Sequence, residues 1–520
     1  MTAFLLAITG GLLLSVAFPP PGFDFLVWVA FIPLFWSLRL MSRPHMALLC
    51  GAVFGFAFFL VDLSWIYGTL ITHGHFSPIM AIAVFIAMIM YLSIFPSSFA
   101  YVVALFSENG ISLAGTAPFL WVVQEYIRSL LFTGFPWDLV GYSQANNLLL
   151  VQVADITGIY GISFLIVLVN ATIWELIQGV LFFSTSVLAV SRLHWKLITA
   201  NVLAFVLVLS YGQIRIKQFS FVHPQRGGCE IGVLQGNIPQ EVKWEDSSRE
   251  KTFATYEALG RKAVEQGANL LIWPETAAPV VFGTANQDWM RPGLISEKLG
   301  VPMLVGAPSK RAQDNGSQYY NSAFLVDSTM IRFHYDKIHL VPFGEYMPLS
   351  SILHVGPGIA AREADYAPGE TMTVMRSRNC PPFSVLICYE AIFPELARLA
   401  VRNGAKLLVN ITNDGWFGET GAPYQHLAMA GLRSIENRVW LLRSANTGIS
   451  AAFDPSGKLV RSIPLQQEGL FVVAVHESHS ANSFYTRFGN VFVYGCIATV
   501  CFLAFLIIRY RGRGKSWNQV

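Results

Sequence analysis

The sequence predicts two parts of different fold class, a multi-span α-helical membrane domain and an α/β domain outside the cytoplasm. Of the 520 residues, 53% are hydrophobic and only 13% are charged, whereas a soluble domain carries about 25% charged residues. Residues 1–212 and 488–508 are poor in charge, but residues 213–487 have the composition of a globular protein. We therefore expect about seven membrane helices in 1–212, a globular domain in 213–487, a final transmembrane helix in 488–508 and a basic cytoplasmic tail in 509–520.

Apolar segments of about 20 residues are long enough to cross a bilayer. The clear candidates are residues 47–70, 78–106, 159–183 and 488–508, and shorter ones are 4–18, 23–38 and 197–211. Residues 111–132 are a weaker candidate because they contain charged residues. Two of these, Glu125 and Arg128, would share one helix face and could form a pair, since an unpaired charge inside a membrane is costly.

Basic residues in the short connections predict the orientation. They lie between the second and third spans, between the sixth and seventh, and after the last: Arg39, Arg43, Arg192, Lys196, Arg509, Arg511, Arg513 and Lys515. The alternate connections, 19–22, 71–77 and 133–158, contain none. Because basic loops stay in the cytoplasm, we expect both termini there and residues 213–487 outside, with Arg215 and Lys217 as exceptions.

In the globular part, short apolar segments alternate with amphipathic ones. Strand-like segments are 230–235, 269–273, 302–306, 322–326, 383–388, 406–411 and 439–444. Ser247 and Glu250 form a possible capping box for a helix that ends at Gly267, and a second helix begins near Pro394 and ends at Gly404. This alternation predicts sheets covered by helices.

Composition also excludes several classes of site. A net charge of +3 without a basic stripe argues against a nucleic-acid partner. The six cysteines have no repeated spacing, so neither a disulfide framework nor a zinc site is expected. His73 and His75 are too few to hold a metal. Cys229 and Cys380 could pair in an oxidising compartment, but the sequence leaves this open.

Three predicted strands end in reactive side chains, where functional groups of α/β folds tend to gather. Glu275 follows a buried run and Pro274, Lys337 continues the apolar face of Phe333 and Tyr335, and Cys388 ends an apolar strand. Each has a plain structural alternative: a solvated loop glutamate, a lysine that extends to solvent, and a small buried apolar cysteine.

Together the three side chains fit acyl transfer through a thiol, which needs a nucleophile, a proton shuttle and a cation for the oxyanion. Cys388 precedes a predicted helix, whose N-terminus would lower the pKa of the thiol. His339 offers a Cys–His pair as an alternative to this arrangement.

The order Glu, Lys, Cys, within Trp273-Pro274-Glu275 and Ile387-Cys388-Tyr389-Glu390, closely resembles the nitrilase superfamily. Further matching motifs are residues 235–240 (QGNIPQ), 337–346 (ending PFGEY) and 413–418 (NDGWFG). Attached to about eight membrane spans, the pattern resembles the apolipoprotein N-acyltransferase branch over almost the whole chain.

This resemblance implies a nitrilase-like α-β-β-α sandwich, on the periplasmic side of a bacterial inner membrane, with no metal or cofactor. Catalysis would use Glu275, Lys337 and Cys388 to move an acyl group from a phospholipid, through a thioester, to the N-terminal diacylglyceryl-cysteine of an apolipoprotein. The enzyme would act as a monomer. Two further carboxylates, Glu345 and Glu390, would position Lys337 or the substrate amine. Four aromatic residues would line the acyl entrance or are ordinary core residues: Trp244, Tyr389, Trp416 and Phe417.

Two other functions use the same sequence features. A membrane-tethered nitrilase-type amidase would carry the same three residues, and a transporter or receptor could carry a catalytically dead sensing domain. The intact triad positions argue against the second, and the apolar segments argue against a soluble enzyme.

Overall fold

The computed structural model describes residues 1–41, 43–183, 194–220, 228–240, 243–285, 287–313, 316–346, 365–477 and 482–511. The chain divides into two compact units. One comprises Met1–Tyr67, Pro78–Ile216 and Phe488–Val520, and the other comprises Gly68–Ser77 and Lys217–Arg487. Most of the basic tail predicted for 509–520 lies outside the described residues.

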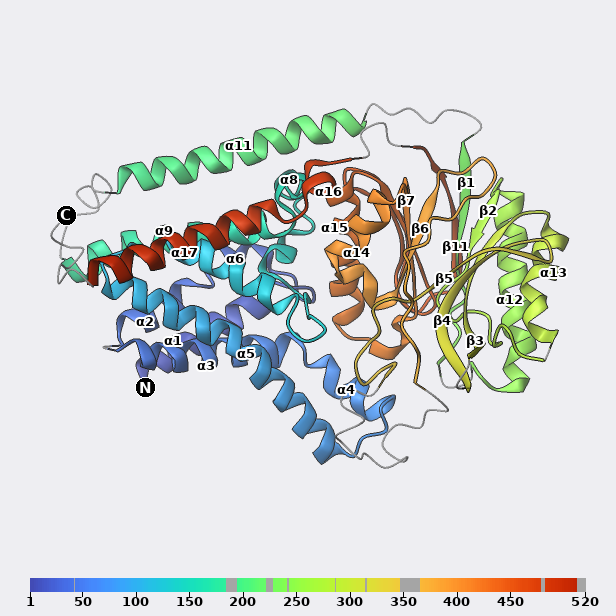
Figure 1. Ribbon diagram of the computed structural model, residues 1–520, viewed down its shortest axis with the longest axis horizontal. Coiled ribbons are helices and arrows are strands. Elements are labelled where there is room, and N and C mark those ends of the chain that lie inside the picture. Colours follow the sequence, from blue (N-terminus) through green and yellow to red (C-terminus); the bar gives the residue numbers. More distant parts are fainter. Residues whose placement is uncertain are drawn as a thin grey trace. The chain divides into compact units, whose positions relative to one another are not determined.

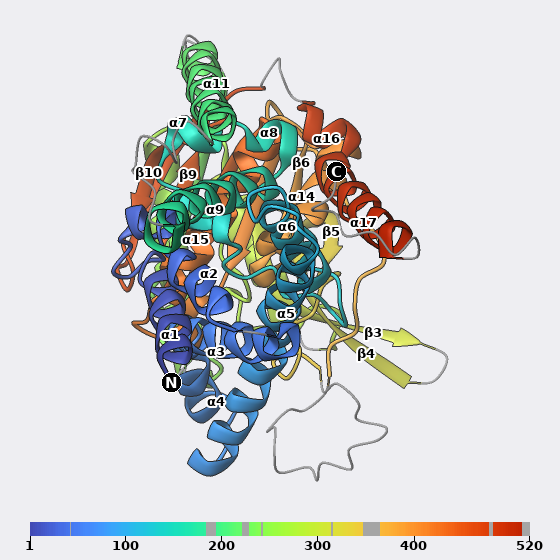
Figure 2. The ribbon, with the colours of Figure 1, turned by 90° about the vertical axis from the view of Figure 1, so that its left-hand side faces the viewer.

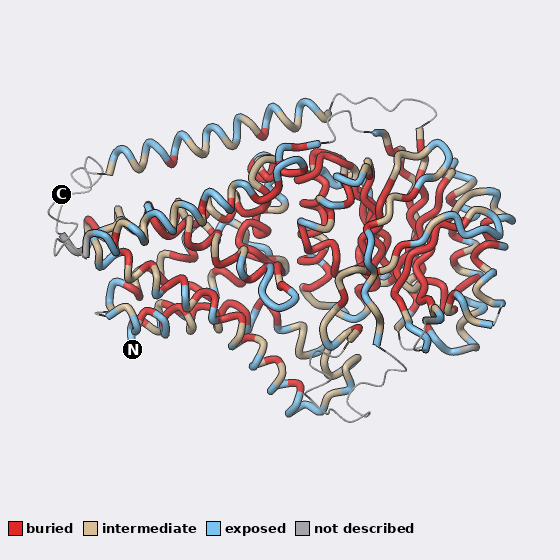
Figure 3. Tube along the Cα trace, viewed as in Figure 1, coloured by how far each residue is buried: buried red, intermediate tan, exposed pale blue. Residues whose placement is uncertain are grey.

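The first unit is helical. Its main helices are α1 (Thr2–Ser15), α2 (Ile32–Arg39), α3 (Pro44–Asp62), α5 (Pro78–Glu108), α6 (Ala117–Arg128), α9 (Tyr160–Phe183), α11 (Trp195–Ser220) and α17 (Val491–Arg511). Shorter pieces are η1 (Asp24–Trp28), η2 (Val140–Gln144), α7 (Leu148–Val151) and α8 (Ala154–Thr157). Among the described helices, α3, α5, α9, α11 and α17 are long and apolar enough to cross a membrane. Figure 3 shows α11 exposed along most of its length, as expected of a helix that faces lipid.

Two predicted spans are interrupted. The prediction of one helix over residues 47–70 is wrong, because α3 ends at Asp62 and α4 (Trp65–Thr72) follows it. Asp62 and Ser64 break the apolar run there, and the Asp62 side chain turns into the unit interior. The segment 23–38 is likewise divided into η1 and α2, since Pro33 lies in the first turn of α2, where proline favours a helix start.

Glu125 and Arg128 lie on the buried face of α6. The Arg128 guanidinium donates to the Trp137 carbonyl oxygen at 3.1 Å. Glu125 accepts hydrogen bonds from Trp121 Nε1 at 2.9 Å and Val140 N at 2.7 Å. Both charged groups therefore secure the end of α6 to the chain that follows it.

The second unit contains two mixed sheets (Figure 1). The first has the order β11-β1-β2-β3-β4-β5 and the second β10-β9-β8-β7-β6. The strands of the first sheet are β1 (Cys229–Gln235), β2 (Leu270–Ile272), β3 (Met303–Gln313), β4 (Gly316–Asp327), β5 (Met330–Asp336) and β11 (Gly469–Val475). Those of the second are β6 (Phe383–Ile387), β7 (Leu407–Thr412), β8 (Trp440–Ala445), β9 (Ser450–Phe453) and β10 (Leu459–Ile463). Figure 2 shows the β3–β4 hairpin reaching past the other strands.

Helices cover the outer face of each sheet. α12 (Asp246–Glu265) and α13 (Arg291–Leu299) pack on the first, and α14 (Pro394–Arg402) and α15 (Ala422–Asn437) pack on the second (Figure 1). Short helices are η3 (Gln287–Met290), η4 (Cys388–Ile392), η5 (Asp414–Phe417) and α16 (Phe484–Phe488). The inner faces meet, and Ser444 Oγ on β8 donates to the Leu234 carbonyl oxygen at 2.9 Å. The predicted α-β-β-α sandwich is confirmed.

Strand direction brings several chain segments to one edge. β2 runs parallel to β1 and β3, and β6 and β8 run parallel to β7. β5 is antiparallel to β4, which is antiparallel to β3, so β5 has the direction of β2. Within each sheet, the carboxyl ends of parallel strands share an edge. Glu275 lies three residues beyond the end of β2, Lys337 directly follows β5 and Cys388 directly follows β6.

The predicted capping box of α12 is wrong. The helix begins at Asp246, one residue before Ser247, and has no side-chain cap. The Glu250 carboxylate instead accepts a hydrogen bond from Arg291 Nη2 at 2.7 Å. The end of the helix agrees with the prediction, since Gly267 follows it with a φ of 96°, which favours glycine.

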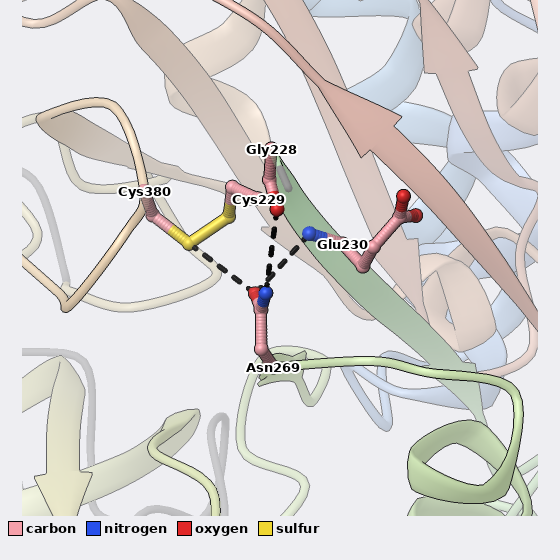
Figure 4. The surroundings of a disulfide bond; sticks show 5 residues. All are labelled: Gly228, Cys229, Glu230, Asn269 and Cys380. Atoms are coloured by element: carbon pink, nitrogen blue, oxygen red, sulfur yellow. Dashed lines mark hydrogen bonds between the residues drawn. A yellow bond between two sulfur atoms is a disulfide. The ribbon is translucent and has the colours of Figure 1, made fainter. Parts of the chain in front are cut away.

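A disulfide joins Cys229 and Cys380 (Figure 4). Cys229 begins β1 of the first sheet, and Cys380 lies just before β6 of the second. Asn269 lies beside the bond, and its Oδ1 accepts a hydrogen bond from Glu230 N at 3.1 Å (Figure 4). The pairing that the sequence left open is therefore formed, and it links the two sheets across 151 residues of chain.

Candidate active site

Glu275 lies just after β2 and is 5% exposed. Its Oε1 accepts a hydrogen bond from Asn321 Nδ2 at 2.7 Å, and its Oε2 accepts one from Asn413 N at 2.9 Å. Both oxygens are thus held from opposite sheets, because Asn321 belongs to β4 and Asn413 follows β7. The carboxylate has a fixed orientation at the shared strand edge.

Lys337 follows β5 and is 1% exposed, so the interpretation of a lysine extending to solvent is wrong. Its Nζ lies 2.8 Å from Glu345 Oε2 and 3.8 Å from Glu275 Oε1. Asn321 Nδ2 also donates to Glu345 Oε1 at 2.8 Å, so a single amide bridges the two carboxylates. The ammonium and both acids form one buried cluster.

Cys388 is the first residue of η4 and is 7% exposed. Its φ of 50° lies in the left-handed region, which non-glycine residues enter at an energetic cost. The thiol interacts electrostatically with Glu275 and Lys337 and lies close to the Thr412 hydroxyl, which donates to Asp414 Oδ1 at 3.0 Å. The turn therefore holds the sulfur among the charged groups of the other strand ends.

Burial, reinforced by the negative charge of Glu275, raises the pKa of the Cys388 thiol, although Lys337 acts in the opposite direction. The prediction of a thiol with a lowered pKa is therefore wrong, because desolvation of the thiolate and the charge of Glu275 outweigh the charge of Lys337. Burial also raises the pKa of Glu275, aided by Glu345 and opposed by Lys337. A neutral thiol beside a strengthened base requires proton transfer during attack.

The charge of Lys337 is secured by its partners. Burial alone would lower the pKa of this ammonium, but Glu345 and Glu275 outweigh burial and hold the pKa above its ordinary value. A permanently protonated lysine can stabilise an oxyanion, but it cannot accept the proton of the thiol. Of these two side chains, Glu275 is the one that could accept the thiol proton.

Glu390 is fully buried and contacts backbone. Its Oε1 accepts from Ile338 N at 2.7 Å and from the Tyr335 hydroxyl at 2.8 Å, and its Oε2 accepts from Ile387 N at 2.7 Å. Burial raises the pKa of Glu390 to about 7, against the effect of these donors. Of the two roles expected for this side chain, the geometry fits positioning of the chain that carries Lys337.

The four aromatic candidates differ in exposure. Trp244 is 46% exposed and Trp416 is 38% exposed, whereas Tyr389 is buried and packs edge-on against Phe393. Phe417 is partly buried. Two exposed indoles are unusual for core residues, so the interpretation as ordinary core aromatics does not fit Trp244 and Trp416.

The His339 ring, considered above as a partner of Cys388, has aromatic neighbours. Its ring packs against Phe393, with centroids 3.8 Å apart, and against Tyr389. Its backbone N donates to Glu390 Oε1 at 3.1 Å. These contacts fit an imidazole that packs among aromatic rings, and the Cys–His pair stays an alternative.

Several residues of the site escaped the sequence analysis. Asn321 bridges the acids, Lys243 lies against the Glu275 backbone, and a group beneath Cys388 includes Asp414, His426 and Arg443. Lys243 is 1% exposed, and its Nζ donates to Thr276 Oγ1 at 2.8 Å. Two signals were available: the motif at residues 413–418, which contains Asp414, and a charged residue inside an apolar strand, as at Arg443 in β8.

Within the described part of the chain, no cluster of three or more His, Cys, Asp or Glu side chains could hold a metal ion. The arrangement offers a thiol, a buried base and a fixed ammonium. These groups suffice for acyl transfer to and from sulfur, with a thioester between the two half-reactions.

Comparison with known proteins gives two matching families. Residues 10–172 match the apolipoprotein N-acyltransferase N-terminal domain, and residues 230–481 match the carbon-nitrogen hydrolase family. An apolipoprotein N-acyltransferase of Geobacter metallireducens is 38% identical over 97% of this chain and 95% of that protein. One from Methylococcus capsulatus is 33% identical over 89% of this chain and 88% of its own. Among solved structures, a nitrilase-superfamily amidase from Nesterenkonia covers 52% of this chain and 97% of its own, at 21% identity and a TM-score of 0.39.

Proposed function

The chain belongs to the apolipoprotein N-acyltransferase family, and we propose that it transfers a fatty acyl group from a membrane phospholipid to the N-terminal diacylglyceryl-cysteine of apolipoproteins. The observation that carries this proposal is the convergence of Cys388, Glu275 and Lys337 at one buried strand edge. The helices of membrane length in the same chain support substrates that carry acyl chains.

In the first half-reaction, Cys388 Sγ attacks the ester carbonyl of the phospholipid while Glu275 accepts the thiol proton. Lys337 Nζ and the backbone N–H of Tyr389 stabilise the tetrahedral oxyanion. The C–O bond then breaks, and Glu275 returns the proton to the departing lysophospholipid oxygen. The acyl group remains on sulfur as a thioester.

In the second half-reaction, the α-amino group of the lipoprotein cysteine attacks the thioester carbonyl. Glu275 accepts a proton from the nitrogen, the C–S bond breaks, and Glu275 gives this proton to the departing sulfur, which restores the thiol of Cys388. The product is an amide, and the two substrates react one after the other in a ping-pong cycle. Glu345 and Glu390 keep Lys337 in position throughout.

The membrane favours transfer over hydrolysis. Each buried CH₂ contributes about 0.8 kcal/mol to the attachment of an acyl chain to the bilayer, so both substrates stay at the membrane. Trp244 and Trp416 provide exposed apolar surface for their chains. A site that excludes water allows the thioester to persist until an amine arrives.

The protein resides in the bacterial inner membrane and acts as a monomer. Its catalytic unit lies on the periplasmic side and both termini lie in the cytoplasm. The distribution of basic residues supports this orientation. The Cys229–Cys380 disulfide supports it independently, since such bonds persist in the oxidising periplasm.

Mass spectrometry of the purified full chain tests the mechanism. After incubation with a phosphatidylethanolamine of defined acyl chains, we expect a hydroxylamine-sensitive acyl adduct on Cys388 and none in Cys388→Ala. Adding a diacylglyceryl-cysteine peptide should discharge the adduct and yield the N-acyl peptide.

Absence of the adduct in the wild-type protein would contradict the proposal. Release of free fatty acid instead of N-acyl peptide would favour the membrane-tethered amidase or hydrolase. Matching between the chain and whole acyltransferases favours transfer.

A further inference from the structure

The backbone carbonyl of Cys388 is held by side chains that the proposed reaction does not use. His426 Nε2 on α15 lies 3.1 Å from this oxygen, and Asn410 Nδ2 on β7 donates to it at 3.4 Å. Cys388 has a φ of 50°, and a non-glycine residue in that region costs about 1–3 kcal/mol. Such a conformation persists only where the surroundings hold it.

His426 is itself fixed by a buried ion pair. Arg443 Nη2 on β8 lies 2.6 Å from Asp414 Oδ2 and 3.1 Å from His426 Nδ1. Arg443 Nη1 also donates to the Asn410 side-chain oxygen. His426 and Arg443 are completely buried, and Asp414 is 1% exposed. We call Asp414, His426 and Arg443 the support network.

Its protonation state follows from its neighbours. Burial and the charge of Arg443 lower the pKa of His426, so the imidazole is neutral. Nδ1 lies 3.1 Å from Arg443 Nη2, a donor, and 3.1 Å from Asp414 Oδ1, an acceptor, whereas Nε2 faces the Cys388 carbonyl oxygen. We assign the single proton to Nε2, because the carbonyl oxygen needs a donor there and Nδ1 can then accept from the guanidinium. Burial alone would raise the pKa of Asp414, but Arg443 and His426 outweigh it and keep that carboxyl ionised.

We propose that the support network acts through His426 to hold the Cys388 carbonyl, and thereby aims the nucleophilic sulfur at Glu275 and Lys337. His426, Asp414 and Arg443 are positioning residues, since their contact is with the backbone of Cys388. The consequence for acyl transfer rests on the proposed function, but the geometric effect on the thiol does not. A misplaced nucleophile slows attack without weakening substrate binding.

The test compares His426→Ala with His426→Gln in the purified full chain. Alanine removes the donor to the Cys388 carbonyl, whereas the glutamine amide restores a neutral N–H donor at similar reach. We expect His426→Ala to lower kcat by about 100-fold, with KM for phospholipid little changed. His426→Gln should recover about tenfold of that loss.

A second readout does not depend on the proposed reaction. The rate of alkylation of Cys388 by iodoacetamide, followed by mass spectrometry of its peptide between pH 6 and 10, reports how the sulfur is presented. We expect a slower rate in His426→Ala and in Asp414→Asn, with partial recovery in His426→Gln. If wild-type Cys388 is never acylated by phospholipid, the proposed function fails, while the alkylation comparison still decides this inference.

The matched control is Glu436→Gln, which changes another fully buried charge on the same helix, paired with Arg433 at 3.1 Å. Its thermal unfolding measures the cost of disturbing α15, and its kcat and alkylation rate should stay near those of the wild type. The inference is overturned if His426→Ala keeps wild-type kcat and alkylation. It is also overturned if Glu436→Gln reproduces the loss, or if glutamine gives no recovery while Asp414→Asn alkylates normally.

Discussion

Two groups of buried charge meet at Cys388, and they differ in their balance. The reactive cluster, Glu275, Lys337 and Glu345, has two carboxylates for one ammonium, and it interacts with the thiol. The support network balances Asp414 with Arg443, and it reaches the backbone of the same residue through His426. In a cluster with unequal numbers of positive and negative groups, the pKa values of the members shift when one proton moves. A buried ion pair with equal and opposite charges keeps its geometry, because separating the two groups is costly. The first group suits chemistry and the second suits geometry.

The unequal charge of the reactive cluster also explains why a further lysine, which belongs to neither group, is buried beside it. Lys243 is buried against the Glu275 carbonyl and Thr276, and its positive charge offsets the excess negative charge of the reactive cluster. The reactive cluster therefore reaches neutrality only with help from a third segment of chain. Four predictions test this division, from the largest expected effect to the smallest.

Glu275→Gln should give the largest loss of activity, because it removes the proposed base from the reactive cluster and leaves the support network unchanged. The amide keeps the size of the side chain but cannot accept the thiol proton, so we expect kcat to fall by about 10²–10⁴-fold. Initial rates of N-acylation, measured with labelled phospholipid, check this. Glu257→Gln, a partly buried glutamate on α12 outside the reactive cluster, is the control. A loss below tenfold would remove Glu275 as the base.

Lys337→Met should affect both rate and stability. Loss of an oxyanion donor costs about 10²–10³-fold in kcat, and two buried carboxylates without their cation cost about 3–5 kcal/mol in the free energy of unfolding. The control is Lys298→Met, whose exposed pair with Glu257 is expected to contribute at most about 1 kcal/mol. Equal destabilisation in the two variants would contradict the buried role of Lys337.

Removing the disulfide should lower stability without touching either group. For Cys229→Ser with Cys380→Ser we expect a loss of about 2–5 kcal/mol, because the bond restricts the unfolded chain. The kcat of the folded fraction should stay at the wild-type level. Thermal unfolding and initial rates measure the two effects, with Cys501→Ser, an exposed free cysteine, as control. A large drop in kcat would show that catalysis follows overall stability rather than the charge groups.

The smallest effect concerns pH. Burial lowers the pKa of Lys243 to about 8, against the attraction of Glu275. Between about pH 8 and the ordinary value of 10.5 the unfolded chain therefore binds more protons at this side chain than the folded protein does. The contribution of Lys243 to the free energy of unfolding therefore rises with pH through that window. Below about pH 8 the buried charge of Lys243 lowers the stability of the folded protein by its full amount.

Lys243→Met should lack this rise. Denaturant unfolding of both proteins at pH 7, 8, 9 and 10 measures the difference in slope, with Lys251→Met as the exposed control on α12. Parallel curves for the wild type and Lys243→Met would show that burial does not lower the pKa of Lys243 in the folded protein.

The sequence predicted much of this molecule because the relevant signals are local. Apolar length predicts membrane helices, alternation predicts the strands, and Glu275, Lys337 and Cys388 each end a recognisable strand. The errors are local as well. The apolar run 47–70 predicts a single helix although α3 ends at Asp62, and Ser247 predicts a cap although Glu250 pairs with Arg291.

Which residues meet was decided by the tertiary structure alone. The Asn321 bridge, the burial of Lys243 and the contact of His426 with Cys388 join segments that are distant along the chain, and nothing local marks them. The sequence predicts a lowered pKa for the Cys388 thiol, but in the structure this pKa is raised. The reason is burial, which depends on how the sheets pack and not on the helix that follows Cys388. Short-range sequence patterns determine the helices and strands and the reactive residues at the strand ends. The distances between those residues, and the low dielectric around them that shifts their pKa values, arise only when the sheets pack.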